Sequence, residues 1–230
     1  MKPSLVLVPG LNNTAAVFDA VIPHLRESCD PLAVNNPALE TVEAIAADLL
    51  PSLPPRFWLA GFSFGGYVAM AMLEAAPERV EGMAMICTAP GADAPAALPR
   101  REAALRAAAE GRYYEMIESL TSAAFHPDSL KDEDLMGRRR AMVRAYGPQC
   151  FSAHLRASIV RPDRTALLDG SIPTLVLGSS HDTLFPPPAL AYAQQIPGVR
   201  QVTIEGAGHL VPMEKPAELA HHLLGWMRVR

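Results

Sequence analysis

Residues 57–67 read Phe57-Trp58-Leu59-Ala60-Gly61-Phe62-Ser63-Phe64-Gly65-Gly66-Tyr67. An apolar run typical of a buried strand passes through a Gly-x-Ser-x-Gly motif into a stretch with helical periodicity, which predicts a sharp strand-to-helix turn at Ser63. Such a turn forces Ser63 into a strained backbone conformation, and Gly61 and Gly65 remove the side chains that would collide there. A strand that leads directly into a helix is the building unit of α/β folds.

Working outward from this turn, short apolar runs alternate with helical patterns along the chain, as in parallel βαβ units. Continuous apolar runs of this length suit strands that are covered by helices on both faces. We therefore predict an α/β fold with a mostly parallel, doubly wound sheet. Strands are expected over 4–8, 56–60, 82–88, 172–177 and 201–204, with a weaker candidate at 32–34, and helices over 14–26, 39–50, 65–76, 187–195 and 216–227.

Residues 91–170 interrupt this alternation. They contain no convincing strand but show helical periodicity over 100–110, 112–124, 130–146 and 150–160, with Gly147-Pro148 among the breaks. Because predicted strands precede and follow this region, we interpret it as a helical cap, or lid, inserted in a single domain of residues 1–230. Its large side chains could line an apolar acyl pocket or form the core of the cap itself: Tyr113, Tyr114, Met116, Phe125, Met136, Met142, Tyr146 and Phe151.

The composition excludes several classes of protein. Half of the 230 residues are hydrophobic and the formal net charge is −4, which rules out a disordered chain. Nucleic acid is not expected as a partner, because phosphate binding needs clustered Lys and Arg. The one basic run, Arg138–Arg140, is predicted to be a solvated helix face, although it and Arg156 and Arg161 could also meet an anionic substrate or an acidic carrier protein.

Further features of the sequence indicate where the protein is located and whether it holds disulfides or a metal. No segment approaches the roughly 18–20 apolar residues that a membrane span requires, so no membrane association is expected. The apolar run near the N-terminus is short and lacks a cleavage site, which favours a cytoplasmic protein. Cys29, Cys87 and Cys150 are odd in number and lack metal-type spacing, so we predict neither a disulfide framework nor a metal site.

Ser63 is the candidate nucleophile. The predicted turn presents its hydroxyl at the start of a helix, where the Phe64 backbone N–H is free and the helix dipole favours negative charge. The alternative is a serine that only caps this helix. A phosphate-binding loop is excluded because no Lys follows the glycines.

A serine nucleophile needs a base, and His209 is the candidate among seven histidines. It stands in the loop Glu205-Gly206-Ala207-Gly208-His209-Leu210, directly after the last predicted strand. There its imidazole can reach over the end of the sheet toward Ser63, and this chain order of nucleophile and base is known for the motif. The alternative is an ordinary loop histidine.

Asp182 is the candidate acid that orients the base. It follows the predicted strand 172–177, at the carboxyl end where open α/β sheets place ligand-facing residues. Asp93, after the preceding strand, is its rival. For the oxyanion we expect the backbone N–H groups of Phe64 and Leu11, since Leu11 lies in the turn Val8-Pro9-Gly10-Leu11 after the first strand. The alternative is an ordinary turn before a helix.

These motifs together resemble the α/β-hydrolase superfamily over essentially the whole chain, and within it small bacterial carboxylesterases of the kind that includes the pimeloyl-carrier-protein methyl ester esterases. The resemblance implies a parallel sheet, a helical lid and no cofactor. Three features depart from the family. Pro9 and Phe62 stand where the family often has histidine, and the chain starts at what resembles the third strand, so the usual N-terminal hairpin is missing.

The hypothesis is a serine hydrolase that cleaves carboxylic esters of small to medium acyl chains with Ser63, His209 and Asp182. The alternatives are a lactonase or carbon–carbon bond hydrolase with the same residues, a cofactor-free haloperoxidase-like enzyme, or a non-catalytic binding protein of the same fold. The expected partner is a small ester or lactone, and the protein is expected to be a monomer or a homodimer.

Overall fold

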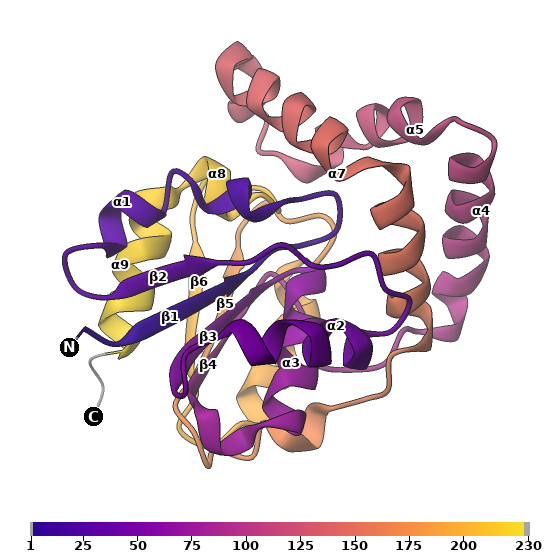
Figure 1. The fold of residues 1–230 in the computed structure, drawn as a ribbon. Coiled ribbons are helices and arrows are strands. Elements are labelled where there is room, and N and C mark those ends of the chain that lie inside the picture. Colours follow the sequence, from indigo (N-terminus) through magenta and orange to yellow (C-terminus); the bar gives the residue numbers. More distant parts are fainter. Residues whose placement is uncertain (1, 228–230) are drawn as a thin grey trace.

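Six parallel strands form the sheet at the centre of the protein, in the order β2-β1-β3-β4-β5-β6 (Figure 1). The computed structural model describes residues 2–227. The strand order reverses direction beside β1, and such a switch point opens a crevice at the carboxyl ends of the strands. The predicted parallel, doubly wound α/β fold is confirmed. The strands are β1 (Ser4–Val8), β2 (Asp30–Ala33), β3 (Phe57–Phe62), β4 (Val80–Ile86), β5 (Thr174–Ser179) and β6 (Arg200–Ile204).

Alternate side chains of each central strand enter two separate apolar layers. In β1, Leu5 and Leu7 belong to one layer, and Val6 and Val8 belong to the other. Both layers are fully buried at these positions, which explains why the strands read as continuous apolar runs.

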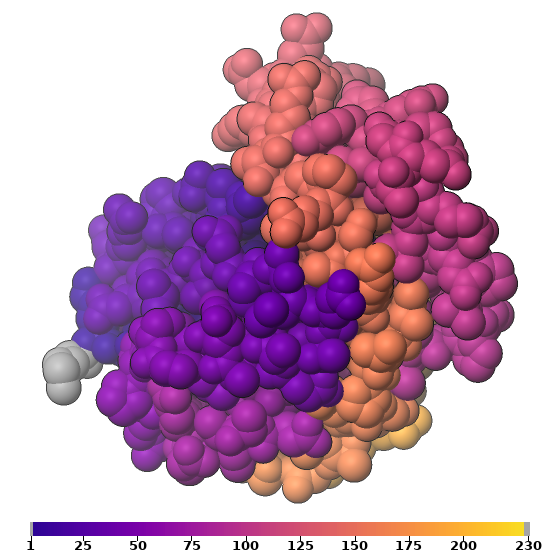
Figure 2. Space-filling view, turned by 45° about the vertical axis from the view of Figure 1, so that its right-hand side comes forward, coloured from indigo at the N-terminus to yellow at the C-terminus, as the bar shows by residue number. Residues whose placement is uncertain are grey.

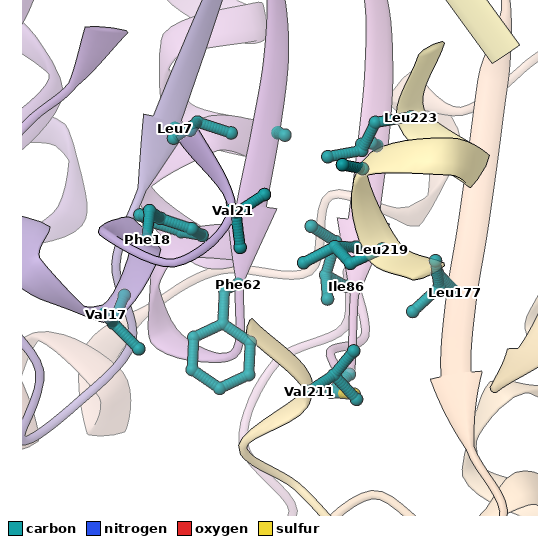
Figure 3. Packing of buried hydrophobic residues seen from close by; sticks show 14 of the residues in the cluster. Leu7, Val17, Phe18, Val21, Phe62, Ile86, Leu177, Val211, Leu219 and Leu223 are labelled. Carbon is teal, nitrogen blue, oxygen red and sulfur yellow. The ribbon is translucent and has the colours of Figure 1, made fainter. Parts of the chain in front are cut away.

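Short helices and a long C-terminal helix cover the first face of the sheet: η1 (Ala15–Phe18), α1 (Ile22–Leu25), α8 (Val211–Glu214) and α9 (Pro216–Met227). In Figure 3, Leu219 and Leu223 of α9 lie against Ile86 of β4 and Leu177 of β5. The second face is covered by α2 (Val42–Leu49) with η2 (Leu50–Ser52), by α3 (Phe64–Ala75) followed by η3 (Pro77–Arg79), and by η7 (Pro187–Gln195).

Two predicted helices differ in form from the expectation. The stretch 14–26 folds as two short helices, η1 and α1, rather than one, and residues 187–195 form a 3-10 helix. The helix expected to start near residue 39 begins at Val42, because the Thr41 hydroxyl accepts a hydrogen bond from the Ala44 N–H at 3.1 Å and caps it.

The cap is the helical insertion between β4 and β5. It contains η4 (Pro95–Ala97), α4 (Leu98–Ala109), α5 (Tyr113–Ser119), α6 (Thr121–Ala124), η5 (Ser129–Lys131) and α7 (Glu133–Val160), and η6 (Thr165–Leu167) follows it. Gly147 interrupts α7 with φ 74° and ψ 167°, so the predicted break at Gly147-Pro148 is confirmed. Figures 1 and 2 place the cap along one side of the molecule, against residues of the N-terminal half.

Polar contacts join the cap to the sheet domain. Arg164, where the chain returns from the cap, bonds Glu43 of α2 at 2.6 Å and Glu74 of α3 at 2.7 Å. Among residues 2–227, the structure contains no helix that combines the length and the apolar character needed to cross a membrane.

One prediction for the cap is wrong. Arg138 and Arg140 are exposed as expected of a solvated face, but Arg139 is only 7 % exposed. The reason is helical spacing, since Arg139 lies on the same side of α7 as the buried Leu135 and Val143. That side faces the turn after β1.

Candidate active site

The turn from β3 into α3 has the strained geometry that the sequence predicts. Ser63 adopts φ 52° and ψ −120°, and its N–H donates to the Ile86 carbonyl at 2.9 Å. A Cβ on Gly61 would lie 2.5 Å from the Gly65 carbonyl oxygen, and one on Gly65 would lie 2.1 Å from that of Val8. Both positions therefore require glycine.

The Ser63 side chain turns toward His209 rather than capping α3. Ser63 makes no side-chain hydrogen bond to the start of the helix. Its Oγ instead lies 2.9 Å from Nε2 of His209. The Ser63 hydroxyl therefore bonds the histidine and does not cap the helix.

His209 lies in a tightly held loop after β6. Its N–H donates to the Ala124 carbonyl of the cap at 2.9 Å, and a Cβ on Gly208 would lie 2.6 Å from the carbonyl carbon of Phe125. The imidazole ring contacts Phe62, with 5.1 Å between ring centroids, and stacks on Phe185 at 5.9 Å. These contacts fix the plane of the ring.

Asp182, after β5, completes a chain of hydrogen bonds with His209 and Ser63. Its Oδ2 accepts from Nδ1 of His209 at 2.8 Å, and because a carboxylate only accepts, Nδ1 carries the proton and Nε2 faces Ser63 as an acceptor. Its Oδ1 accepts from the N–H groups of Leu184 and Phe185, both at 2.8 Å. Burial favours a raised pKa for Asp182, but the hydrogen bonds from His209 and from these N–H groups lower it overall, which keeps the carboxylate ionised.

Asp93, His126 and His181 take no part in the hydrogen-bonded chain of Ser63, His209 and Asp182. Asp93 pairs with Arg101 at 2.9 Å and with Arg161 at 3.4 Å. His181 is exposed and packs edge-on against His126, with 4.4 Å between ring centroids. The Asp93 carboxylate therefore pairs with arginines of the cap and does not contact His209.

The two backbone N–H groups expected to hold an oxyanion belong to segments that meet at Ser63. Phe64 is the first residue of α3, and Leu11 follows Gly10. A Cβ on Gly10 would lie 3.0 Å from Cβ of Ser63, so the turn after β1 passes directly beside the nucleophile candidate. The Asn36 side chain holds this turn by donating to the Pro9 carbonyl at 2.9 Å.

Cys87 is a buried neighbour of the site that the sequence did not indicate. It follows β4 with φ 48°, and its sulfur, a carboxylate oxygen of Asp182 and a ring nitrogen of His209 all lie within 4.8 Å of one another. Cys, Asp and His are all potential metal ligands. Burial and the adjacent carboxylate raise the pKa of Cys87 well above its ordinary value, so the thiol stays protonated, and Asp182 and His209 already bond to each other. The set therefore fits a hydrogen-bonded cluster better than a metal centre.

A groove of about 330 Å³ lies between η1 and the first half of α7. Val17, Leu135, Met142 and Met213 give it apolar walls, but neither Ser63 nor His209 lines it. Of the cap side chains considered for an acyl pocket, Met142 lines this groove, and Tyr113, Tyr146 and Phe151 pack in the core of the cap. Tyr114 is exposed.

The sequence profile of the alpha/beta hydrolase family matches residues 5–222, and the chain belongs to this family. Among its relatives is the pimeloyl-[acyl-carrier protein] methyl ester esterase of Aromatoleum aromaticum, 25% identical over 95% of this chain and 96% of that protein. A solved thermophilic esterase from Thermogutta terrifontis superposes with a TM-score of 0.88 at 28% identity, over 99% of this chain and 90% of that one. The enol-lactonase of Burkholderia xenovorans LB400 has the same fold, with a TM-score of 0.88 at 19% identity over 99% of this chain and 92% of that one.

Proposed function

We propose that this protein is a serine hydrolase that cleaves carboxylic esters of small to medium acyl chains through an acyl-enzyme. The observation that carries the proposal is the hydrogen-bonded chain from Ser63 Oγ through His209 to Asp182, with distances of 2.9 Å and 2.8 Å. The same constellation of nucleophile, base and orienting acid recurs in hydrolases of unrelated folds.

In the proposed acylation step, the Ser63 oxygen attacks the ester carbonyl carbon while its proton moves to Nε2 of His209. The ionised Asp182 holds the Nδ1 proton and stabilises the imidazolium that forms. The carbonyl oxygen becomes an oxyanion, and collapse of the tetrahedral intermediate expels the alcohol, which leaves with the proton from His209.

The N–H groups of Phe64 and Leu11 are the proposed donors to this oxyanion. In residues 2–227, neither N–H donates to a loop, turn or side-chain acceptor, so both are available. The start of α3 adds the positive end of the helix dipole at the same place. Water then attacks the acyl-enzyme with His209 as the base and releases the acid.

The comparisons support an ester as the substrate class. The esterase from Thermogutta terrifontis and the methyl ester esterase from Aromatoleum aromaticum both align with nearly the whole chain. A lactone presents the same electrophilic carbonyl within a ring, so it is the second substrate class to test.

The test is a panel of p-nitrophenyl esters of increasing chain length, with lactones included, run on the wild type, Ser63→Ala and a control, Ser171→Ala, whose serine is exposed. Replacing Ser63 should lower kcat by up to about 10⁶-fold, as in other serine hydrolases, and abolish labelling by a fluorophosphonate. The control should behave as the wild type. A Ser63→Ala variant that keeps most of the activity would overturn the proposal.

The proposed base adds a second expected outcome. Asp182→Asn should lower kcat by roughly 10⁴-fold, because the amide no longer holds His209 in the required tautomer. Since only neutral His209 can accept the Ser63 proton, kcat/KM should rise with pH as the imidazole loses its proton. A kcat/KM that does not fall at any acidic pH at which the protein stays folded would contradict this assignment.

A further inference from the structure

The turn that follows β1 contains a backbone conformation that needs support. Asn12, the neighbour of Leu11, has φ 59°, in the left-handed region where asparagine is tolerated better than most residues. Asn12 is also largely buried, at 9 % exposure. Because each peptide unit is planar, the direction of every N–H in the turn depends on the backbone angles of its neighbours, and the placement of Asn12 therefore constrains the peptide units on either side of Leu11.

Two side chains of the cap bond Asn12 directly. Nη1 of Arg139 donates to the Asn12 carbonyl at 2.7 Å and to Oδ1 of Asn13 at 2.9 Å. The Tyr113 hydroxyl donates to Oδ1 of Asn12 at 3.1 Å. Asn13 in turn donates from its side-chain amide to the Leu11 carbonyl at 2.7 Å, so Arg139 is linked to Leu11 through one residue.

Tyr146 lies beside the same turn, because it belongs with Tyr113 to the apolar cluster of the cap against which Leu11 packs. Burial raises the pKa of Tyr146 well above its ordinary value, and the Asn12 N–H, next to the hydroxyl oxygen, acts against this rise. The Tyr146 hydroxyl also bonds Nδ1 of His154 at 2.6 Å, and Nε2 of His154 bonds the Pro37 carbonyl at 2.7 Å. Because that carbonyl only accepts, Nε2 carries the proton and Nδ1 accepts from Tyr146.

The burial of the Arg139 guanidinium in the cap costs free energy of folding. Among residues 2–227 its guanidinium forms no ion pair within 4.0 Å, although Glu118 attracts it from further away, and its Nε has no hydrogen-bond partner; burial, the largest effect, lowers its pKa to about 10. A buried cation whose nearest carboxylate lies beyond ion-pair distance is destabilising compared with an apolar side chain of similar size. Stability therefore does not account for an arginine at this place.

We propose that Tyr113, Arg139 and Tyr146 are positioning residues, through which the cap fixes the turn after β1 so that the Leu11 N–H points at the oxyanion. The proposal rests on the proposed function, because it gives these residues a role in the same reaction. It also gives the cap a part in transition-state stabilisation.

A positioning role predicts a specific kinetic signature. The Leu11 N–H would matter mainly when negative charge develops, so a misplaced turn should lower kcat and leave KM nearly unchanged. Complete loss of one oxyanion donor costs about 10²- to 10³-fold in kcat, so displacement of the turn should cost about 10- to 100-fold. The pH dependence of kcat/KM should keep its midpoint, because His209 and Asp182 are not touched.

The experiment compares Tyr146→Phe, Tyr113→Phe and Arg139→Met with two matched controls from the same helices. Tyr114→Phe removes the hydroxyl of an exposed neighbour, and Arg140→Met removes an exposed guanidinium that lies 4.0 Å from Glu118. For each variant we would measure the melting temperature, kcat and KM on a p-nitrophenyl ester, and inhibition by two probes. A trifluoromethyl ketone forms a tetrahedral oxyanion with the serine, and the carboxylic acid product resembles the ground state.

In the positioning variants, the inhibition constant of the ketone should rise by the same factor by which kcat/KM falls, while that of the acid stays constant. Arg139→Lys, which keeps a donor for the Asn12 carbonyl, should recover part of the loss. If Arg139→Met does not fold, Tyr113→Phe and Tyr146→Phe still test the inference, since each substitution removes only a hydroxyl group and keeps the aromatic ring. Variants that match their controls, or that weaken both probes equally, would overturn the inference. A wild type without ester hydrolysis and without fluorophosphonate labelling would instead overturn the proposed function.

Discussion

Backbone strain is concentrated at single residues around the candidate nucleophile. Ser63, Asn12 and Cys87 all have positive φ; Ser63 and Cys87 directly follow β3 and β4, and Asn12 lies in the turn after the neighbouring strand β1. Such conformations cost of order 1–3 kcal/mol each and persist only where the surroundings over-determine them. For Ser63 and Cys87 the surroundings are the paired strands β3 and β4, and for Asn12 they are the hydrogen bonds from Arg139 and Tyr113 of the cap.

Gly65 gives the sharpest test at this scale. In Gly65→Ala the new Cβ would meet the Val8 carbonyl oxygen at 2.1 Å, and β1 cannot move aside because strands flank it on both sides. We expect a loss of at least about 1–3 kcal/mol in the free energy of unfolding, together with a large fall in kcat. Gly91→Ala is the control, since its nearest atom lies 3.7 Å away. Urea unfolding and ester hydrolysis measure both effects, and equal behaviour of the two variants would contradict the argument.

The helix α7 shows how one element serves two parts of the molecule. Its first half carries Arg139 to the turn after β1, and its second half carries His154 to Pro37 and packs Ala157 against the sheet domain. A straight helix would continue in one direction, and the change of direction falls at Gly147. The conformation there, φ 74° and ψ 167°, is essentially restricted to glycine.

Two glycines of α7 should therefore respond in opposite directions to the same substitution. Neither Gly137 nor Gly147 has an atom within 4 Å of an added Cβ, so no collision complicates the comparison. Gly147→Ala should lower the free energy of unfolding by about 1–3 kcal/mol, because alanine does not tolerate this conformation. Gly137→Ala, in regular helix, should raise it by roughly 0.5–1 kcal/mol. Urea denaturation measures both free energies of unfolding. Stabilisation by both substitutions would show that Gly147 is not needed for the kink.

The same element marks the limit of prediction from sequence. Strands such as β1 and the turn at Ser63 are encoded locally, by apolar runs and by glycines that no other residue could replace. Asp182 and His209 could be proposed because parallel strands bring their carboxyl ends to one edge of the sheet. The role of Arg139 could not be predicted, since three adjacent arginines are typical of a solvated helix face. Arg139 is buried only because α7 packs on a turn that lies 127 residues earlier in the sequence.

At the scale of the whole molecule, the cap and the sheet domain are joined by polar contacts as well as apolar packing. Arg164 reaches Glu43 and Glu74, and His154 reaches Pro37. The carboxylates that meet Arg164 are half exposed, so water screens those pairs. His154 is fully buried and stacks on Phe64, with 4.9 Å between ring centroids. We therefore expect that lowering the pH weakens the contact between the cap and the sheet domain by protonating His154.

Burial lowers the pKa of His154, and the hydrogen bond to the Pro37 carbonyl opposes this only in part. The folded protein thus binds this proton less readily than the unfolded chain, whose histidines titrate near about 6.5. The resulting stability is present above that pH and is lost as the pH falls through it, by up to about 1.4 kcal/mol per pH unit for one proton. We expect the free energy of unfolding, measured in urea between about pH 7.5 and 5.5, to depend less steeply on pH in His154→Gln than in the wild type. His24→Gln, at an exposed position, should keep the wild-type slope. An unchanged slope in His154→Gln would mean that this histidine does not couple acidification to unfolding.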